Sequence, residues 1–159
     1  MRKTLPLLLS FVFVAWAGTA RASHYAVADV PRLITPAQVE KLHKGQVETT
    51  EQLLDKGAKS KDRKALAKVT GLKAPELLAL VHRADLLRIK GVGSEMVLLL
   101  EAAGVKSTAD LVGKEPGPLT AEMEKVNKTA KISEKPPTEP QLADWIAQAK
   151  KLPQVVENK

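Results

Sequence analysis

The feature that most limits how this chain can fold is a series of short apolar stripes at helical spacing, separated by glycine and proline. One stripe occupies positions i, i+3, i+4, i+7 and i+10, on one face of a helix: Leu77, Leu80, Val81, Ala84 and Leu87. A similar stripe near the end of the chain consists of Leu142, Trp145, Ile146, Ala149 and Leu152. No segment shows the strict apolar–polar alternation of a half-buried strand. The pattern predicts an all-α bundle of about eight mostly short helices.

Capping residues and breakers predict where several helices begin and end. Thr35 precedes Pro36 and stands three residues before Gln38, which is the order of a capping box. Ser107 begins another short helix in the same way. Two further short helices are expected over residues 50–55, closed by Lys56-Gly57, and over residues 119–127.

The chain also resembles itself when Val39 is aligned with Val97. At this shift Val39, Leu42, Val47, Thr50, Leu53 and Leu54 fall on Val97, Leu100, Val105, Thr108, Leu111 and Val112. Each copy contains a buried helix, a break, a threonine at a helix start and a short helix with an apolar end. Thr35 aligns with Gly93, so both copies begin their first helix at the same place. The shift predicts a duplicated unit, at about residues 33–56 and 86–113.

A glycine-rich turn, Ile89-Lys90-Gly91-Val92-Gly93, lies between two amphipathic helices. The glycines permit positive φ and a close helix approach, and Val92 is expected to fill the space between the helices. The free N–H groups of Gly93 and Ser94 are expected at a helix N-terminus, which favours anions. The candidate phosphate or DNA contacts are therefore Arg88, Lys90, Gly91, Gly93, Ser94 and Lys106.

This turn, with its flanking helices, resembles a helix-hairpin-helix motif. Taken with Thr50 to Leu54, Ala84-Asp85-Leu86, Glu124-Lys125-Val126-Asn127, Pro136-Pro137-Thr138 and Asp144-Trp145-Ile146-Ala147-Gln148-Ala149-Lys150, the chain resembles the bacterial domain-of-unknown-function family 4332. The resemblance covers about residues 33–153. It implies a tandem helix-hairpin-helix (SAM-like) bundle and no established activity.

Two departures from that pattern weaken the case for DNA binding. The resemblance implies a Gly-x-Gly turn in the first unit, but this chain has Leu33-Ile34-Thr35 there. Glu95 follows the glycines of the second unit, where a basic residue would help, and its charge repels phosphate. The alternative role for Gly91 and Gly93 is to let two helices pack.

Residues 1–22 have the composition of a secretory signal peptide. Arg2 and Lys3 precede an apolar run, and Ala20-Arg21-Ala22 supplies the small residues of a cleavage site. Cleavage between Ala22 and Ser23 is expected, with an uncleaved N-terminal anchor as the alternative. Residues 23–32 then form an irregular lead-in, residues 33–153 the domain and residues 154–159 a loose tail.

Loss of the leader changes what the composition implies. The formal net charge falls from +7 to +4, which argues only weakly for nucleic acid. Tyr25 and Trp145 are then the remaining aromatic residues, so the ring surfaces on which single-strand binders stack bases are missing. The chain has no cysteine, which rules out a lipoprotein anchor and thiol chemistry. No second apolar run approaches the length of a membrane span.

The remaining candidate residues favour structural roles. His24, His43 and His82 have no ligand spacing, so no metal and no cofactor are expected. No set of serines, histidines and carboxylates has a catalytic arrangement, so the chain is not expected to be an enzyme. Trp145 is expected to anchor the core. The basic stretch from Lys56 to Lys64 is interpreted as a solvated face, with a surface for an acidic partner as the alternative.

These features predict an exported, periplasmic or secreted, non-enzymatic interaction module with an unidentified protein partner. The alternative is a nucleic-acid-binding protein that contacts the DNA backbone through Gly91-Val92-Gly93.

Overall fold

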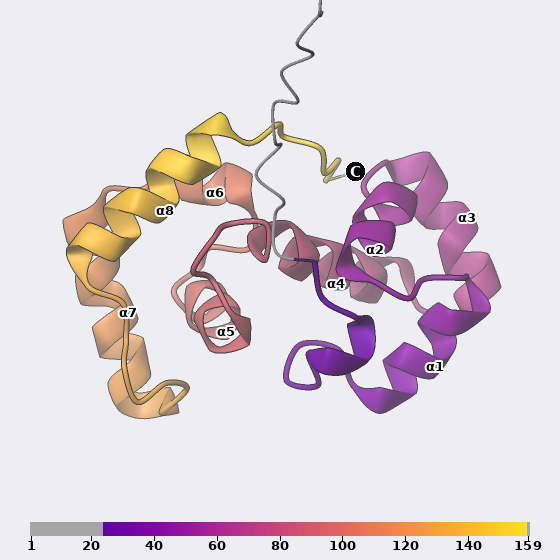
Figure 1. Ribbon diagram of the computed structural model, residues 1–159, viewed down its shortest axis with the longest axis horizontal. Coiled ribbons are helices and arrows are strands. Elements are labelled where there is room, and N and C mark those ends of the chain that lie inside the picture. The colour runs from indigo at the N-terminus through magenta and orange to yellow at the C-terminus, as the bar shows by residue number, and fades with distance from the viewer. Residues whose placement is uncertain (1–23, 159) are drawn as a thin grey trace, which may run out of the picture.

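The computed structural model describes residues 24–158, and its helices form two groups joined by a central helix (Figure 1). The first group contains the 3-10 turn η1 (Val27–Asp29), α1 (Pro36–Lys44), α2 (Thr50–Gly57) and α3 (Ser60–Thr70). The second contains α5 (Ser94–Ala102), α6 (Thr108–Val112), α7 (Pro116–Ala130) and α8 (Glu139–Lys151). Between them, α4 (Ala74–Leu86) packs against α2, α3 and α6.

The predicted all-α class is confirmed by these elements. In the described part of the chain, strand-like pairing is limited to one isolated bridge, between Ala26 and Thr49. None of the helices formed by residues 24–158 has the length and apolar character needed to cross a bilayer. The predicted cleavage residues, Ala22 and Ser23, lie outside the described residues.

The local capping signals form as predicted. The side chain of Thr35 accepts from the backbone N–H of Gln38, and the side chain of Gln38 accepts from the backbone N–H of Thr35. Ser107 and Asp110 make the same reciprocal pair at the start of α6. Both pairs satisfy N–H groups that a helix N-terminus leaves without partners, which is why these short helices begin where they do.

Two helices are longer than the sequence predicted. α7 begins at Pro116 rather than residue 119, because proline in a first turn loses no helical hydrogen bond. α2 continues to Gly57, which was expected to end it. A Cβ on Gly57 would lie 2.5 Å from Cγ2 of Val81, so this glycine lets α2 approach α4 closely.

Both predicted apolar stripes contribute to one continuous core. All five residues of the first stripe, from Leu77 in α4 to Leu87 just after it, are buried. In α8, the side chains of Leu142, Trp145, Ile146 and Ala149 are buried, and Trp145 is 4% exposed. Trp145 is thus a core residue, as predicted.

The internal repeat recurs in the hydrogen bonds of the two groups. Four backbone bonds of the first unit join Val39 to Thr35, Gln46 to His43, Val47 to Leu42 and Leu53 to Thr49. Their counterparts at the aligned positions of the second unit join Val97 to Gly93, Gly104 to Glu101, Val105 to Leu100 and Leu111 to Ser107. The segments 35–53 and 93–111 therefore have the same local backbone structure.

The two units differ in what precedes them. The second unit follows the 13-residue helix α4, whereas the first follows one turn of 3-10 helix. This short lead-in is nevertheless packed, since Val27 and Val30 are buried. Tyr25 also exchanges two hydrogen bonds with Thr50, the first residue of α2.

The last described residues are anchored rather than loose. The backbone N–H of Glu157 donates to the carbonyl oxygen of Ala58, at the end of α2, over 2.9 Å. Buried Arg63 donates to the carbonyl oxygens of Gly57, Ala58 and Glu157. Burial lowers the pKa of the Arg63 guanidinium, and the charge of Glu157 opposes this shift. These bonds explain why the last described residues end beside α2 and α3 (Figure 1).

Candidate functional site

The loop between α4 and α5, residues 87–93, contains most of the candidate contact residues. Gly91 has φ +92°, a conformation that glycine adopts without strain. The backbone N–H of Val92 donates to the carbonyl oxygen of Ile89, and the side chain of Val92 is buried, as expected for a residue between two helices. Gly93 is the N-cap of α5, and no described side chain caps that helix end.

Helix α8 covers one side of this loop. The side-chain amide of Gln148 makes two bonds to Lys90: its oxygen accepts from the backbone N–H over 2.9 Å, and its nitrogen donates to the carbonyl oxygen over 3.2 Å. Trp145 lies against Gly91, because a Cβ there would be 3.1 Å from the indole Nε1. The backbone of the loop is therefore held by the last helix of the chain.

The two loop glycines have different roles. Gly93 has φ −98° and ψ −176°, which any residue adopts, and a Cβ there would meet nothing within 4 Å. The expectation that both glycines need their conformational freedom is therefore wrong for Gly93. It holds for Gly91, whose positive φ strains any other residue and where a Cβ would press on Trp145.

We expect Gly91→Ala to lower the free energy of unfolding by about 2–3 kcal/mol, since it adds positive-φ strain to a contact with Trp145. Gly93→Ala is the matched control, expected within about 0.5 kcal/mol of the unsubstituted protein. Urea denaturation followed by circular dichroism measures both. Equal losses for the two variants would contradict this account of the loop.

Arg88 is held by a buried carboxylate. Its Nη1 donates to Oδ1 of Asp85 over 2.6 Å and to the carbonyl oxygen of Pro153 over 3.2 Å. Oδ2 of Asp85 accepts from the backbone N–H and the hydroxyl of Thr108 over 3.0 and 2.6 Å. Asp85 is 2% exposed. This cluster fixes the start of α6 beside the end of α4, and it places Arg88 in the fold.

The other basic candidates do not converge on one point. Lys90 is exposed beside Gly91, at the loop. Lys106 is also exposed but follows the opposite end of α5, where its backbone N–H donates to Asp110. Ser94 is half-buried in the first turn of α5. The structure thus brings Lys90, Gly91, Gly93 and Ser94 together in sequence and space, and leaves Lys106 outside that group.

The first turn of α5 also contains an ion pair that the sequence did not predict. Glu95 accepts from Nη1 of Arg32 over 2.7 Å, and Nη2 of Arg32 donates to the carbonyl oxygen of Ile132 over 3.0 Å. Both charged side chains are about half exposed. Arg32 lies in the turn that precedes α1, so the segment leading into the first unit meets the second unit at the N-terminus of α5.

Asp85, Gln148 and Arg32 are the residues at this site that sequence reasoning missed. Each forms a hydrogen bond with a residue that is distant in sequence. The separation is 23 residues for Asp85, 58 for Gln148 and 63 for Arg32. Asp85 and Gln148 belong to segments that carry the family resemblance, and that resemblance is the sequence signal that could have identified them.

The three histidines are surface residues with single polar neighbours. Nε2 of His24 lies 3.6 Å from Glu51, Nε2 of His43 lies 3.2 Å from Glu48, and His82 contacts Asn158. Within residues 24–158 no three histidine or carboxylate side chains are grouped as a metal site would require. Away from the histidines, a hydrogen bond from the side-chain amide of Gln38 in α1 lowers the pKa of Glu76 in α4.

The duplicated local structure and the loop held by α8 define an all-α protein built from two related helical units. Residues 32–152 match the model of the family described as Domain of unknown function (DUF4332), and the chain belongs to this family. The predicted family is confirmed. No curated protein and no solved structure matches the chain.

Proposed function

We propose that this protein is an exported, non-enzymatic interaction module, built from two helix-hairpin-helix units, that binds another protein. The repeated hydrogen bonds of segments 35–53 and 93–111 support the two-unit interpretation. The charged start and apolar run within residues 1–22 support export.

The observation that carries the proposal is the commitment of the hairpin's polar groups to internal contacts. Arg88 is paired with buried Asp85, and the backbone of Lys90 is bonded to Gln148. Glu95, paired with Arg32, places a carboxylate in the first turn of α5. A DNA backbone needs several free cations at the point of contact, and this loop offers Lys90 beside an acidic residue.

DNA-backbone binding is the second candidate, and one observation favours it. The space above Gly93 is open, since a Cβ there would meet nothing within 4 Å, and Lys90 is exposed beside it. A phosphate has access to the N–H groups at the start of α5 from that side.

A titration of labelled duplex and single-stranded oligonucleotides, read by fluorescence anisotropy at two salt concentrations, separates the two candidates. For the protein-binding module we expect feeble retention of DNA, with a Kd of about 10⁻⁴ M or weaker at physiological salt. Lys90→Ala is expected to leave this unchanged, because Lys90 is an exposed side chain that supports no packing.

The DNA-binding candidate predicts a different result in the same titration. Binding at about 10⁻⁶ M or tighter, weakened by Lys90→Ala with a salt slope lower by about one, would replace the proposed function with DNA binding through the hairpin. Lys114→Ala, which changes an exposed lysine before α7, is the matched control for charge.

A further inference from the structure

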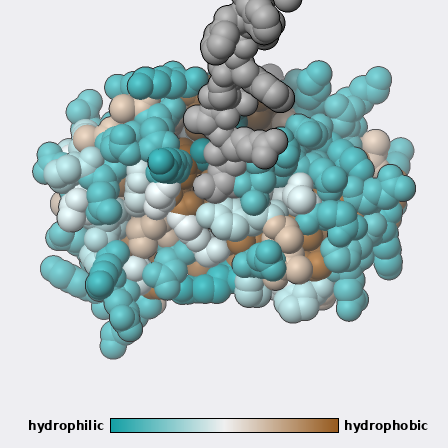
Figure 2. All heavy atoms as spheres, in the orientation of Figure 1, coloured by the Kyte–Doolittle hydropathy of each residue, from teal (hydrophilic) through white to brown (hydrophobic). Residues whose placement is uncertain are grey.

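Helix α3 packs on α1, α2 and α4 through one face and leaves the opposite face to solvent. Arg63, Leu66 and Thr70 are its buried residues. The free face lies at the outer edge of the first group of helices (Figure 1), and mostly hydrophilic residues cover that end of the molecule in Figure 2.

The free face of α3 has a basic row, Lys61, Lys64 and Lys68, spaced by three and four residues. Side chains at these spacings are neighbours on a helix, and like charges there destabilise it. All three lysines are exposed, and within residues 24–158 none of them forms an ion pair with an acidic side chain. The row is therefore a strip of positive charge that no acidic side chain of residues 24–158 pairs with directly, although Glu157 lines the groove beside it.

An apolar strip, Ala65 and Val69, runs beside the basic row. Val69 is 59% exposed, whereas nearly all other large apolar side chains of the described chain are buried or half-buried. The strip separates two grooves: one faces the turn after α1, and the other lies between the basic row and Glu157. An apolar ridge next to a charged row has the pattern of a surface for an amphipathic segment.

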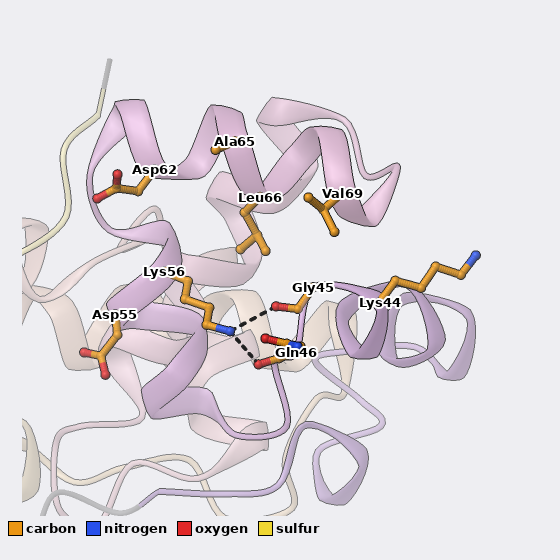
Figure 3. Close-up of a pocket in the computed structure, with 9 residues that line it drawn as sticks. All are labelled: Lys44, Gly45, Gln46, Asp55, Lys56, Asp62, Ala65, Leu66 and Val69. Atoms are coloured by element: carbon orange, nitrogen blue, oxygen red, sulfur yellow. Dashed lines mark hydrogen bonds between the residues drawn. The ribbon is translucent and has the colours of Figure 1, made fainter.

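The groove on the α1 side has a fixed floor, shown in Figure 3. Leu66 and Val69 point into it from α3, above the turn formed by Gly45 and Gln46. Nζ of Lys56 donates to the carbonyl oxygens of both turn residues, over 3.1 and 2.8 Å. Lys56 is thus used to shape the groove, while the three lysines of the basic row remain available.

We propose that the free face of α3 binds an acidic amphipathic helix of a partner protein. Apolar side chains of that helix pack on Ala65 and Val69, and its carboxylates lie over Lys61, Lys64 and Lys68. This inference rests on the proposed protein-binding function and names the chemistry of the partner. Charge complementarity with the three exposed lysines selects an acidic partner, and the exposed apolar side chain of Val69 beside them selects a segment with an apolar face over a nucleic-acid backbone.

The test uses a fluorescein-labelled peptide designed as an amphipathic helix of glutamate, alanine and leucine, with a lysine-for-glutamate peptide as its control. We expect the acidic peptide to bind with a Kd of about 10⁻⁵ M and the lysine peptide not to bind. Lys64→Glu with Lys68→Glu is expected to weaken binding at least about tenfold. Val69→Ser is expected to weaken it severalfold at both low and high salt, since that contact is apolar.

Lys114→Glu with Lys128→Glu is the matched control, because it changes the net charge equally at exposed positions outside α3. It is expected to change the Kd by less than about twofold at physiological salt. Thermal unfolding by circular dichroism verifies that all variants fold. Equal effects of the two double substitutions, or no binding of the acidic peptide, would overturn the proposal.

Two further probes identify the alternatives. Duplex DNA or phosphatidylglycerol vesicles that bind through Lys64 and Lys68, in place of the peptide, would assign the face to that ligand and reject a protein helix. If the protein binds DNA and Lys90→Ala abolishes that binding, the proposed protein-binding function is rejected, because DNA then binds at the hairpin. Failure of the α3 proposal and failure of the proposed function therefore give different experimental results.

Discussion

Replacing Trp145 with alanine is expected to lower the free energy of unfolding by about 3–5 kcal/mol. Trp145 is 4% exposed and is the side chain through which α8 contacts the α4–α5 loop at Gly91. Its removal leaves a cavity at that contact and removes a large apolar surface from the core. Urea denaturation followed by far-ultraviolet circular dichroism measures the change, since the substitution also removes the tryptophan fluorescence of residues 23–159.

Trp145→Phe is the companion variant, because it keeps an aromatic ring and loses the part of the indole nearest Gly91. We expect it to destabilise the protein clearly less than alanine does. A urea midpoint that hardly moves in Trp145→Ala would show that Trp145 does not anchor α8 to the loop.

Asp85→Ala is expected to cost about 3–5 kcal/mol of stability, by a different mechanism. The substitution leaves Arg88, whose side chain is 11% exposed, without its carboxylate. It also leaves the buried backbone N–H of Thr108 without its acceptor, and the Thr108 hydroxyl keeps only the longer of its two bonds, to Oε1 of Gln154 over 3.3 Å. Denaturation in urea with the same optical readout measures this loss.

Asp110→Ala tests whether burial is the cause. Asp110 also accepts backbone hydrogen bonds at the start of α6, from Lys106 and Ser107, but it is exposed. Loss of such an exposed cap is expected to cost about 1 kcal/mol. If Asp85→Ala costs no more than Asp110→Ala, the buried cluster makes no special contribution.

The parts of the fold that could be predicted are those that depend on neighbouring residues. The capping pair of Thr35 and Gln38, and that of Ser107 and Asp110, act over three residues, so the sequence predicts them directly. The stripe of α8 likewise follows from helical periodicity, including the burial of Trp145.

The parts that could not be predicted depend on contacts between distant segments. Gly57 continues α2 where the sequence predicted its end, and the reason that this position is a glycine, the close approach of Val81 in α4, is not visible in the local sequence. Gly91 and Gly93 look alike in sequence, and only their backbone angles and the position of Trp145 separate them. At the candidate site, the sequence identified the loop, but not that Gln148 bonds to Lys90, that Arg32 pairs with Glu95 or that Asp85 accepts from Thr108.

Helix α2 is held at both ends by segments from opposite ends of the described chain, and this has a consequence for the order of folding. Thr50, at its start, bonds to Tyr25, and the carbonyl oxygen of Ala58, after its end, accepts from Glu157. In the proposed export the chain is delivered N-terminus first, so the first contact can form early while the second waits until Glu157 has arrived. One of the first helices to be delivered thus reaches its final contacts only after every other described helix has followed it. A nascent chain that stops short of Glu157, however long it pauses, lacks that last contact.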